Sequence, residues 1–195
     1  MKAGLLLTNE NAGLLAIGPL WRLKAEGQAP CAAALQQQLQ CYRTPRMTLN
    51  GLRQMDSPAV LRLHLPDGSA YAVLERLDDQ RVTLSAGERR WTLPTADFSR
   101  IWRGEYLTLW RTPPGQKGHL HNGYHGPAAL WMAQRLDALQ RQGVLPPGAR
   151  SLREKVEAFQ RSRGIEINGR AAPTTLILLQ RATDHKEPRL SAPPI

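Results

Sequence analysis

The sequence predicts an α+β protein in which an antiparallel sheet region precedes a small helical region. Between Ala59 and Arg111, apolar residues alternate with polar ones in short runs separated by turn sequences, which is typical of antiparallel strands. Between Gly126 and Gln180 the apolar residues recur at helical spacing instead. Because most of the strand-like runs follow one another before the helix-like runs of 126–180 begin, we expect strands and helices in separate regions rather than in alternation.

Composition and charge narrow the classes of function. The 195 residues carry a formal net charge of +10 at pH 7, and 42% of them are hydrophobic, which suffices for one packed domain or two small ones. An anionic partner suits this charge: peptidoglycan, an anionic membrane surface or nucleic acid. Nucleic acid is the weakest of these, because the basic residues are scattered and no zinc-finger, helix-turn-helix or RNA-binding signature occurs. No apolar run approaches the ~20 residues of a membrane-spanning helix.

The first part of the chain reads as helices followed by strands. We expect a lead-in helix over 1–27, a helix from Cys31 to Leu39, a loop from Tyr42 to Arg46 and a helix from Thr48 to Met55. The strands expected next are Ala59–Leu65, Tyr71–Leu77, Arg81–Ser85, Arg89–Leu93 and Glu105–Arg111, with a short helix from Thr95 before the last. The region 28–111 should therefore form one domain.

Three short amphipathic helices are expected over 126–183. Ser151 followed by Glu154 is a capping-box signature for the second helix, and Pro173 suits the first position of the third. Asn168-Gly169 between them favours a tight turn. These local signals agree in order with one compact helical domain.

Two segments are expected to lack regular structure. The Pro- and Gly-containing stretch 112–125 is typical of a linker, and 184–195 of a mobile tail. The linker holds His119, His121 and His125, whose spacing loosely suggests a metal site. No Cys or carboxylate stands near them in sequence, so we expect neither a metal site nor a cofactor.

The order of parts in 126–183 resembles the small peptidoglycan-binding domain of bacterial cell-wall hydrolases. The matching residues are Phe159-Gln160, Gly164, Ile165, Asn168-Gly169, Ala172, Thr175 and Leu179. Asn168 stands where the family has Asp, and Ala172 where it has Gly. Since Asn keeps the turn-forming hydrogen bond, we expect the turn to form. The alternative is an ordinary helical bundle.

This resemblance implies a wall-binding groove beside the second and third helices. The candidate binding residues are Gln160, Arg163, Asn168, Arg170 and Thr175. The guanidinium of Arg163 or Arg170 could bind peptide carboxylates in a bidentate pair. For each candidate the alternative is an ordinary solvated side chain. Trp131 could stack on a sugar, although packing between domains is the simpler role.

A helix opening at Cys31 and followed by antiparallel strands resembles the papain-like cysteine peptidases of bacteriocin exporters. In that family the Cys is followed by Gly-x-Ala, which Cys31–Ala34 matches loosely. The family's His opens the strand where Ala70 stands, and its Asp ends the next strand where Ser85 stands. A cysteine nucleophile needs a base and a residue that orients the base. We therefore expect a peptidase-like scaffold that has no catalytic residues and is not an enzyme.

Cys31 and Cys41 are the only two cysteines. In an exported protein such a pair is usually a disulfide. In an unbroken helix they would lie ~15 Å apart, whereas a disulfide needs a Cα separation below ~7 Å. The bond therefore requires the chain to fold back near Leu39, and the alternative is two buried thiols.

The whole chain resembles the periplasmic part of the general secretion pathway protein A family. Besides the cysteine pair, the resemblance rests on Leu15–Trp21, Ser57–Leu61, Trp102–Tyr106 and Leu109–Arg111. Family members carry an ATPase domain and one membrane span before this part, but these 195 residues contain neither a phosphate-loop motif nor a span.

That resemblance implies a non-catalytic module in the periplasm. The module would bind peptidoglycan, multimerise on the cell wall as a homo-oligomer, and help an inner-membrane partner protein assemble the outer-membrane secretin of type II secretion. The rival function is a cell-wall hydrolase or cysteine peptidase with a peptidoglycan-targeting domain.

Overall fold

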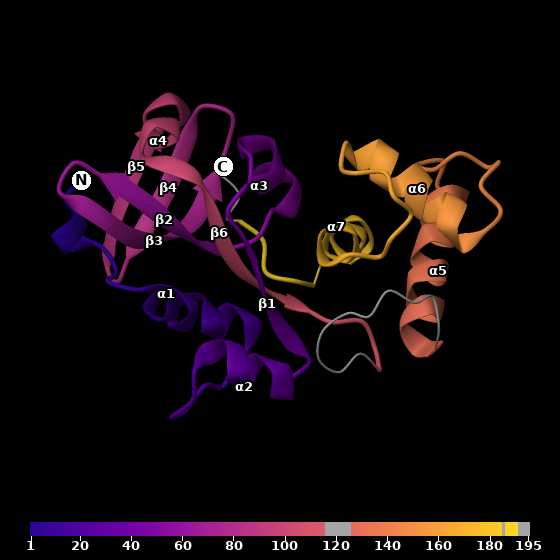
Figure 1. The fold of residues 1–195 in the computed structure, drawn as a ribbon, viewed down its shortest axis with the longest axis horizontal. Coiled ribbons are helices and arrows are strands. Elements are labelled where there is room, and N and C mark those ends of the chain that lie inside the picture. Colours follow the sequence, from indigo (N-terminus) through magenta and orange to yellow (C-terminus); the bar gives the residue numbers. More distant parts are fainter. Residues whose placement is uncertain (116–125, 185, 191–195) are drawn as a thin grey trace. The chain divides into compact units, whose positions relative to one another are not determined.

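The computed structural model describes residues 1–115, 126–184 and 186–190. The chain divides into two compact units, Met1–Arg111 with Glu187–Ile195, and Thr112–Lys186. The first unit holds the sheet and the second holds three helices (Figure 1). The expected α+β class is confirmed. Within the described ranges, no helix combines the length and apolar character needed to cross a membrane.

Six antiparallel strands form the sheet of the first unit, in the order β1-β6-β2-β3-β4-β5 (Figure 1). Their bounds are Leu39–Thr44 (β1), Ala59–Leu65 (β2), Gly68–Leu77 (β3), Arg81–Ala86 (β4), Arg89–Pro94 (β5) and Trp102–Arg111 (β6). β2 to β5 follow one another as hairpins. β6 is the last strand in sequence but lies between β1 and β2, so it ties the N-terminal strand to the hairpins.

The expectation for the residues around β1 was wrong. We expected a helix up to Leu39 and a loop from Tyr42, but helix α2 (Pro30–Gln36) ends sooner. Gln38 then has a φ of +55°, which turns the chain back, and β1 pairs with β6. Pairing with a strand that is distant in sequence overrides the weak local preference of this stretch for a helix or a loop. Such pairing cannot be predicted from the local sequence pattern.

Helices cover both faces of the sheet (Figure 1). α1 (Glu10–Ile17) packs on β2, β3 and β6, and α2 packs on β1. α4 (Thr95–Ile101) lies against the other face, on β2, β4, β5 and β6. Gly13 allows α1 to approach β2 closely, because a Cβ at this position would lie 2.5 Å from Cγ1 of Val60. The helix expected from Thr48 to Met55 is present as α3 (Leu49–Met55), and the Thr48 hydroxyl caps it.

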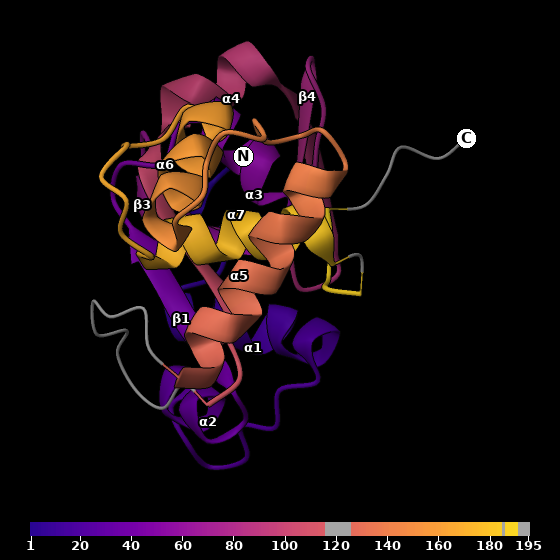
Figure 2. The same ribbon diagram turned by 90° about the vertical axis from the view of Figure 1, so that its right-hand side faces the viewer.

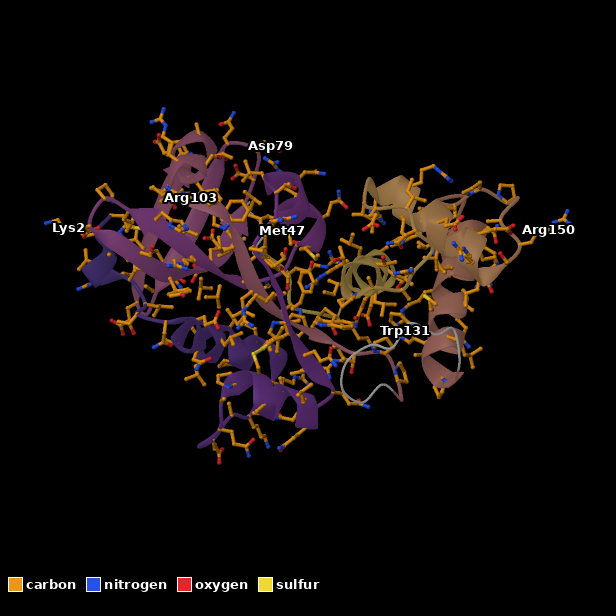
Figure 3. All side chains as sticks on the ribbon, in the orientation of Figure 1. Lys2, Met47, Asp79, Arg103, Trp131 and Arg150 are labelled. Carbon is orange, nitrogen blue, oxygen red and sulfur yellow. A yellow bond between two sulfur atoms is a disulfide. The ribbon has the colours of Figure 1, made fainter. Side chains whose placement is uncertain are left out.

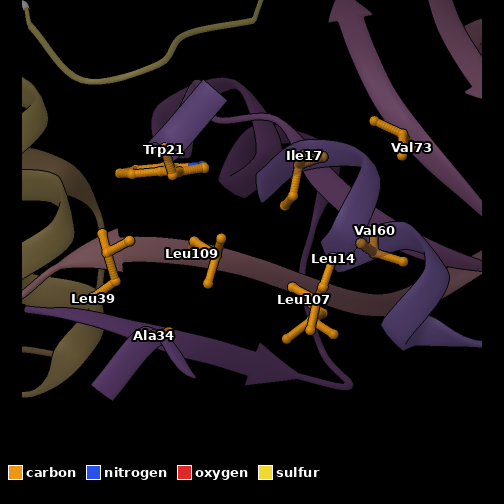
Figure 4. Close-up of a cluster of buried hydrophobic side chains, with 9 residues drawn as sticks. All are labelled: Leu14, Ile17, Trp21, Ala34, Leu39, Val60, Val73, Leu107 and Leu109. Atoms are coloured by element: carbon orange, nitrogen blue, oxygen red, sulfur yellow. The ribbon is translucent and has the colours of Figure 1, made fainter. Parts of the chain in front are cut away.

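The segment 1–27 belongs to the core of this unit and is not a separate lead-in. Leu14 and Ile17 of α1, with Trp21 of the 3-10 helix η2 (Gly18–Trp21), are buried against the sheet (Figure 4). The cluster is completed by Ala34, Leu39, Val60, Val73, Leu107 and Leu109. Before α1, the 3-10 helix η1 (Ala3–Leu5) leads to a bridge between Leu7 and β3.

The second unit is built from α5 (Gly126–Arg141), α6 (Leu152–Arg163) and α7 (Pro173–Thr183). α5 packs against both other helices, and Figure 2 shows α7 crossing α5. The predicted capping box is confirmed: Glu154 N donates to Ser151 Oγ at 3.2 Å, and Ser151 N donates to Glu154 Oε2 at 2.9 Å. Pro173 is the first residue of α7, as expected.

The chain returns to the first unit after Lys186. There Arg189 pairs with Asp56 at 2.5 Å, Leu190 N donates to Asp56 O at 3.3 Å, and Glu187 pairs with Arg111 at 3.4 Å. The described residues 187–190 therefore differ from the mobile tail expected over 184–195. Residues 185 and 191–195 of that tail, and 116–125 of the expected linker, lie outside the described residues.

Candidate functional site

A disulfide joins Cys31, the second residue of α2, to Cys41 of β1 (Figure 3). The reversal at Gln38 brings their Cα atoms to 5.6 Å, within the range that a disulfide allows. Since the chain has only these two cysteines, it has no free thiol.

The positions expected to correspond to a peptidase triad do not converge. Tyr71 packs against the same cluster as Cys31. Ala70 precedes Tyr71 in β3, so its side chain points to the opposite face of the sheet. Ser85 lies opposite Val73 and shares the face of Cys31, but β4 is four strands from β1, roughly 19 Å at ~4.8 Å per strand. A base at either position could not reach the Cys31 sulfur.

The helix over the centre of the sheet is α1, not the cysteine-bearing α2. α1 lies on β2, β3 and β6, whereas α2 lies on the edge strand β1. The first turn of α1 presents Glu10, Asn11 and Ala12. The first turn of α1 therefore offers no thiol or hydroxyl, and the Cys31 sulfur at the start of α2 is held in the disulfide.

A hydrogen-bonded chain that we did not predict links β6, β2 and the start of β3. His64 Nε2 lies 2.7 Å from Glu105 Oε1, and Ser69 Oγ lies 3.4 Å from His64 Nδ1. Hydroxyl, imidazole and carboxylate follow in the order of a Ser-His-acid triad. Ser69 is exposed in the hairpin, and its contact to His64 is long for a hydrogen bond. His64 alternates with Arg62 along β2, and this pattern by itself gives no sign of a partner.

Glu105 is an ionised and partly buried carboxylate. Burial raises its pKa, but the hydrogen bond from His64, its own backbone N–H and the positive charges of His64 and Arg62 outweigh burial and hold the pKa below the usual carboxyl value. His64 Nε2 is therefore the donor to Oε1. The second oxygen, Oε2, is buried and has no hydrogen-bond partner in the described part of the chain.

Glu105 lines a hollow of about 260 Å³ on the face of the sheet that α1 covers. The hollow lies beside the first turn of α1 and is bordered by β1, β6, β2 and β3. Its other lining residues include Glu10, Arg43, Val60, Arg62, Tyr71 and Leu107. The walls are mainly apolar, and the charged lining residues are Glu10, Arg43, Arg62 and Glu105.

In the second unit, Gln160 is the centre of a buried hydrogen-bond network at the end of α6. Its Oε1 accepts from the backbone N–H groups of Asn168 (3.0 Å) and Gly169 (2.9 Å). Its Nε2 donates to Asn168 Oδ1 (3.1 Å), Arg170 O (3.0 Å) and Thr175 Oγ1 (3.2 Å). Only 1% of Gln160 is exposed. One side chain thus joins α6, the turn after it and α7.

The structure joins four of the five predicted wall-binding residues, all except Arg163, in the network around Gln160, but gives them different roles. Gln160 and Thr175 are buried, and Gln160 directs its polar atoms at the turn and at Thr175, so neither presents its side chain at the surface. Asn168 also bonds the backbone N–H of Arg170. The Arg170 side chain is exposed, and the Arg163 guanidinium lies 5.3 Å from the centre of the Phe159 ring.

A hollow in this unit lies between α5 and α6. It is lined by Gln134, Asp137, Gln140, Arg141 and Lys155. Lys155 Nζ donates to Asp137 Oδ1 at 2.5 Å, so its charge is already paired. The Arg135 guanidinium lies over the ring of Trp131 in α5, with its carbon 4.1 Å from the ring centre.

Among the described side chains, no group of three or more His, Cys, Asp or Glu is placed to hold a metal ion. His119, His121 and His125 lie outside the described residues.

The sequence of the first unit matches a known family. A family model described as "GspA, peptidase C39-like domain" matches residues 15–112, half of the 195 residues. The chain belongs to this family. The family-level resemblance inferred from the sequence is confirmed, and the match covers β1 to β6 together with α2, α3 and α4.

Full-length relatives and one solved structure extend the similarity of this GspA-family chain beyond residue 112. It is 27% identical over 175 residues to the general secretion pathway protein A of Aeromonas hydrophila, covering 88% of this chain and 32% of that protein. It is 25% identical over 151 residues to the putative general secretion pathway protein A of Escherichia coli K12, covering 76% and 31%. The chain thus spans about a third of the length of these relatives.

The solved structure is a periplasmic domain of the EpsAB fusion protein of the Vibrio vulnificus type II secretion system. The similarity has a TM-score of 0.57 at 27% identity and covers 92% of this chain and 81% of that one. The similarity therefore includes residues of both units and is not limited to the peptidase-like half.

Proposed function

We propose that this chain is a non-catalytic module of type II secretion that binds peptidoglycan in the periplasm. One observation carries the proposal: the only two cysteines are joined in a disulfide on a peptidase-like sheet. A cysteine peptidase needs a free thiolate beside a base, and neither Ala70 nor Ser85 is a base or lies where one could act. The fold would then serve binding and assembly rather than cleavage.

The disulfide also supports a location outside the cytoplasm. Such bonds persist in oxidising compartments such as the periplasm and are rare in reducing ones. The similarity to general secretion pathway protein A and to a periplasmic domain of a type II secretion protein supports the same periplasmic location. Because the chain spans about a third of its curated relatives, the proposal covers the matched part alone.

The second unit supports the wall-binding part of the proposal. Gln160 and Asn168 fix the turn between α6 and α7, and this turn carries the exposed Arg170 and the 48% exposed Ile167. An exposed guanidinium next to an apolar side chain suits a peptide that has a carboxylate and methyl groups, such as a wall stem peptide. The net charge of +10 favours approach to an anionic wall.

Assembly on the wall completes the proposal. The chain would multimerise when bound to peptidoglycan and act with an inner-membrane secretion partner, which in turn supports the outer-membrane secretin. Chemical cross-linking of the purified chain with and without sacculi tests this step. Oligomers should form mainly in the presence of sacculi, and an unchanged monomer band would contradict it.

Co-sedimentation with purified sacculi tests wall binding. The wild-type chain should pellet, and the double variant Arg163→Gln with Arg170→Gln should remain largely in the supernatant. The control variant Arg141→Gln with Arg150→Gln removes two charges from exposed positions of the same unit and should pellet like the wild type. If the double variant pelleted normally, the binding surface would lie elsewhere; if the wild type failed to pellet, wall binding would be wrong.

The chain from Ser69 through His64 to Glu105 favours a second candidate function, a cell-wall hydrolase. The order of hydroxyl, imidazole and carboxylate suits nucleophilic catalysis. The position of Ser69 in an exposed hairpin and its long 3.4 Å contact to His64 argue against catalysis. Release of dye from labelled sacculi decides between the two. We expect no release; release that is lost in Ser69→Ala would establish the hydrolase.

A further inference from the structure

The helical segment 12–21, which covers most of α1 and all of η2, consists of Ala, Gly, Leu, Ile, Pro and Trp only. A helix on the surface of a protein usually carries polar side chains on its outer face. The inner side of this segment is accounted for, because Leu14, Ile17 and Trp21 are buried against the sheet (Figure 4). The outer side of the segment is therefore apolar as well.

This outer side is exposed. Leu15, Ala16, Pro19 and Leu20, which we call the outer stripe, are all exposed, Leu15 by 52% and Leu20 by 57%. Their spacing along the continuous segment of α1 and η2 is that of neighbours on one side of a helix. Single exposed apolar side chains are ordinary on protein surfaces, whereas a contiguous group of them indicates an interaction site.

Two cations follow the outer stripe directly. Arg22 and Lys24 are exposed, and neither forms an ion pair with a described residue. Arg22 is held at the end of η2, where its N–H donates to Pro19 O at 3.0 Å. Lys24 N donates to Gln37 Oε1 at 3.0 Å, which fixes this part of the chain beside the end of α2. Because Glu26 is the one acidic residue nearby in sequence, the charge next to the stripe is net positive.

This combination favours a lipid surface over a protein partner. A specific protein interface buries roughly 800 Å² on each partner and needs a matching shape, an area that four side chains do not supply. A second copy of the chain would bring its own Arg22 and Lys24, and a net charge of +10, against the same charges. A bilayer needs no matching shape, and anionic headgroups attract both cations.

We propose that α1 and η2 form a membrane-contacting site, which inserts the outer stripe into the surface of an anionic bilayer and places Arg22 and Lys24 at the phosphate headgroups. The apolar segment has ten residues, about half of the ~20 that a spanning helix needs, so it lies on the bilayer and does not cross it. Leu14 and Ile17 anchor the opposite side of the segment to the sheet. This inference does not rest on wall binding.

Flotation of the purified full-length chain with lipid vesicles tests the site. Vesicles of phosphatidylglycerol and phosphatidylethanolamine supply an anionic surface, and vesicles of phosphatidylcholine alone supply a neutral one. The wild type should float with the anionic vesicles and stay largely at the bottom with the neutral ones, because apolar contact and charge attraction act together. A wild type that did not float with the anionic vesicles would overturn the proposal.

A double variant of the outer stripe localises the site. Leu15→Gln with Leu20→Gln removes both leucines and keeps residues that favour a helix. Each leucine still has about half of its surface to bury, so this variant should partition onto anionic vesicles at least about tenfold more weakly. The control Leu130→Gln with Val144→Gln changes two exposed apolar residues of the second unit and should float like the wild type. Circular dichroism checks folding, and wild-type flotation of the folded stripe variant would refute the site.

The cations are tested separately. Arg22→Gln with Lys24→Gln should weaken flotation with anionic vesicles about tenfold, because two charges near the headgroups are lost. Unchanged flotation would contradict the placement of Arg22 and Lys24 at the headgroups.

Size-exclusion chromatography without lipid distinguishes the bilayer from a second copy. The wild type and the Leu15→Gln, Leu20→Gln variant should both elute as monomers. A wild-type dimer that dissociates in this variant would assign the outer stripe to self-association and overturn membrane contact. Because sacculi are absent from all of these measurements, failure here would leave the wall-binding test unaffected.

Discussion

The side chain of Gln160 hydrogen-bonds to Asn168 twice, once through each of its polar atoms. Oε1 accepts from Asn168 N at 3.0 Å, and Nε2 donates to Asn168 Oδ1 at 3.1 Å. The helix-ending Gln and the turn-forming Asn, eight residues apart, are thus partners in one network. This relationship gives a structural reason for two sequence features that looked independent.

Replacing Gln160 should destabilise the second unit strongly. Gln160→Ala would leave the buried backbone N–H of Gly169 without its acceptor and remove the bonds to Arg170 and Thr175. We expect a loss of about 3 kcal/mol in unfolding free energy, measured by urea denaturation. Gln134→Ala, at an exposed position of α5, should change it by less than about 0.5 kcal/mol. Equal effects would show that the network contributes little.

Gly13 should tolerate no side chain. A Cβ there would meet Cγ1 of Val60 at 2.5 Å, so Gly13→Ala would push α1 off the sheet or distort it. Overpacking of this kind costs about 1–3 kcal/mol. Gly4→Ala is a matched control, because nothing lies within 4 Å of a Cβ at that position. Thermal unfolding of the two variants should differ clearly, and a stable Gly13→Ala protein would contradict the packing of α1 on β2.

The disulfide should stabilise the first unit, and its reduction should not produce a catalytically active thiol. Its loop spans a sequence separation of 10, so replacing both cysteines by Ala should cost roughly 3 kcal/mol in urea denaturation. Reduction should lower the stability of the wild type by a similar amount. It should not change the stability of the double variant. Reduced wild type should also cleave no peptide; cysteine-dependent cleavage would reverse our assignment of Cys31.

The capping box predicts a specific dependence of stability on pH. Hydrogen bonds from the backbone N–H groups of Ser151 and Arg150, and then from the Ser151 hydroxyl, lower the pKa of Glu154 below its ordinary value of 4.5. The unfolded chain therefore takes up the proton at a higher pH than the folded chain does. The stabilisation is complete above pH 4.5 and is lost as the pH falls through the lowered pKa.

Glu154→Gln should remove this part of the acid dependence. Urea denaturation of wild type and variant at a series of pH values checks it: their difference in stability should be largest near neutral pH and shrink in acid. Glu166→Gln, at an exposed position of the same unit, should keep the wild-type profile. A constant difference between wild type and Glu154→Gln at all pH values would contradict the predicted pKa.

Local patterns predicted the parts of the fold that depend on neighbouring residues. The capping box of Ser151 and Glu154 and the strands from Ala59 onward are set within a few residues, and the structure has them. The reversal at Gln38 and the place of β1 depend on pairing with β6, some 70 residues later in sequence. Local sequence carries no signal for such a partner, so that region was mispredicted.

The His64–Glu105 pair of the first unit could not be predicted from local sequence for the same reason. His64 meets Glu105 only because β2 and β6 are neighbours in the sheet, and their sequence separation of 41 residues hides the pair. In the second unit the sequence singled out Gln160 and Arg170 as candidates, but only the structure showed that Gln160 faces inward while Arg170 faces solvent. Pattern gives residue type and order, whereas side-chain direction depends on packing.

Incubation of the purified chain with sacculi, followed in one experiment for protein in the pellet and for soluble muropeptides in the supernatant, tests the central claim most directly. We expect the protein to pellet with the sacculi while the supernatant stays free of muropeptides. Protein that remains in the supernatant, or muropeptides that accumulate with time, would contradict a module that binds the wall and leaves it intact.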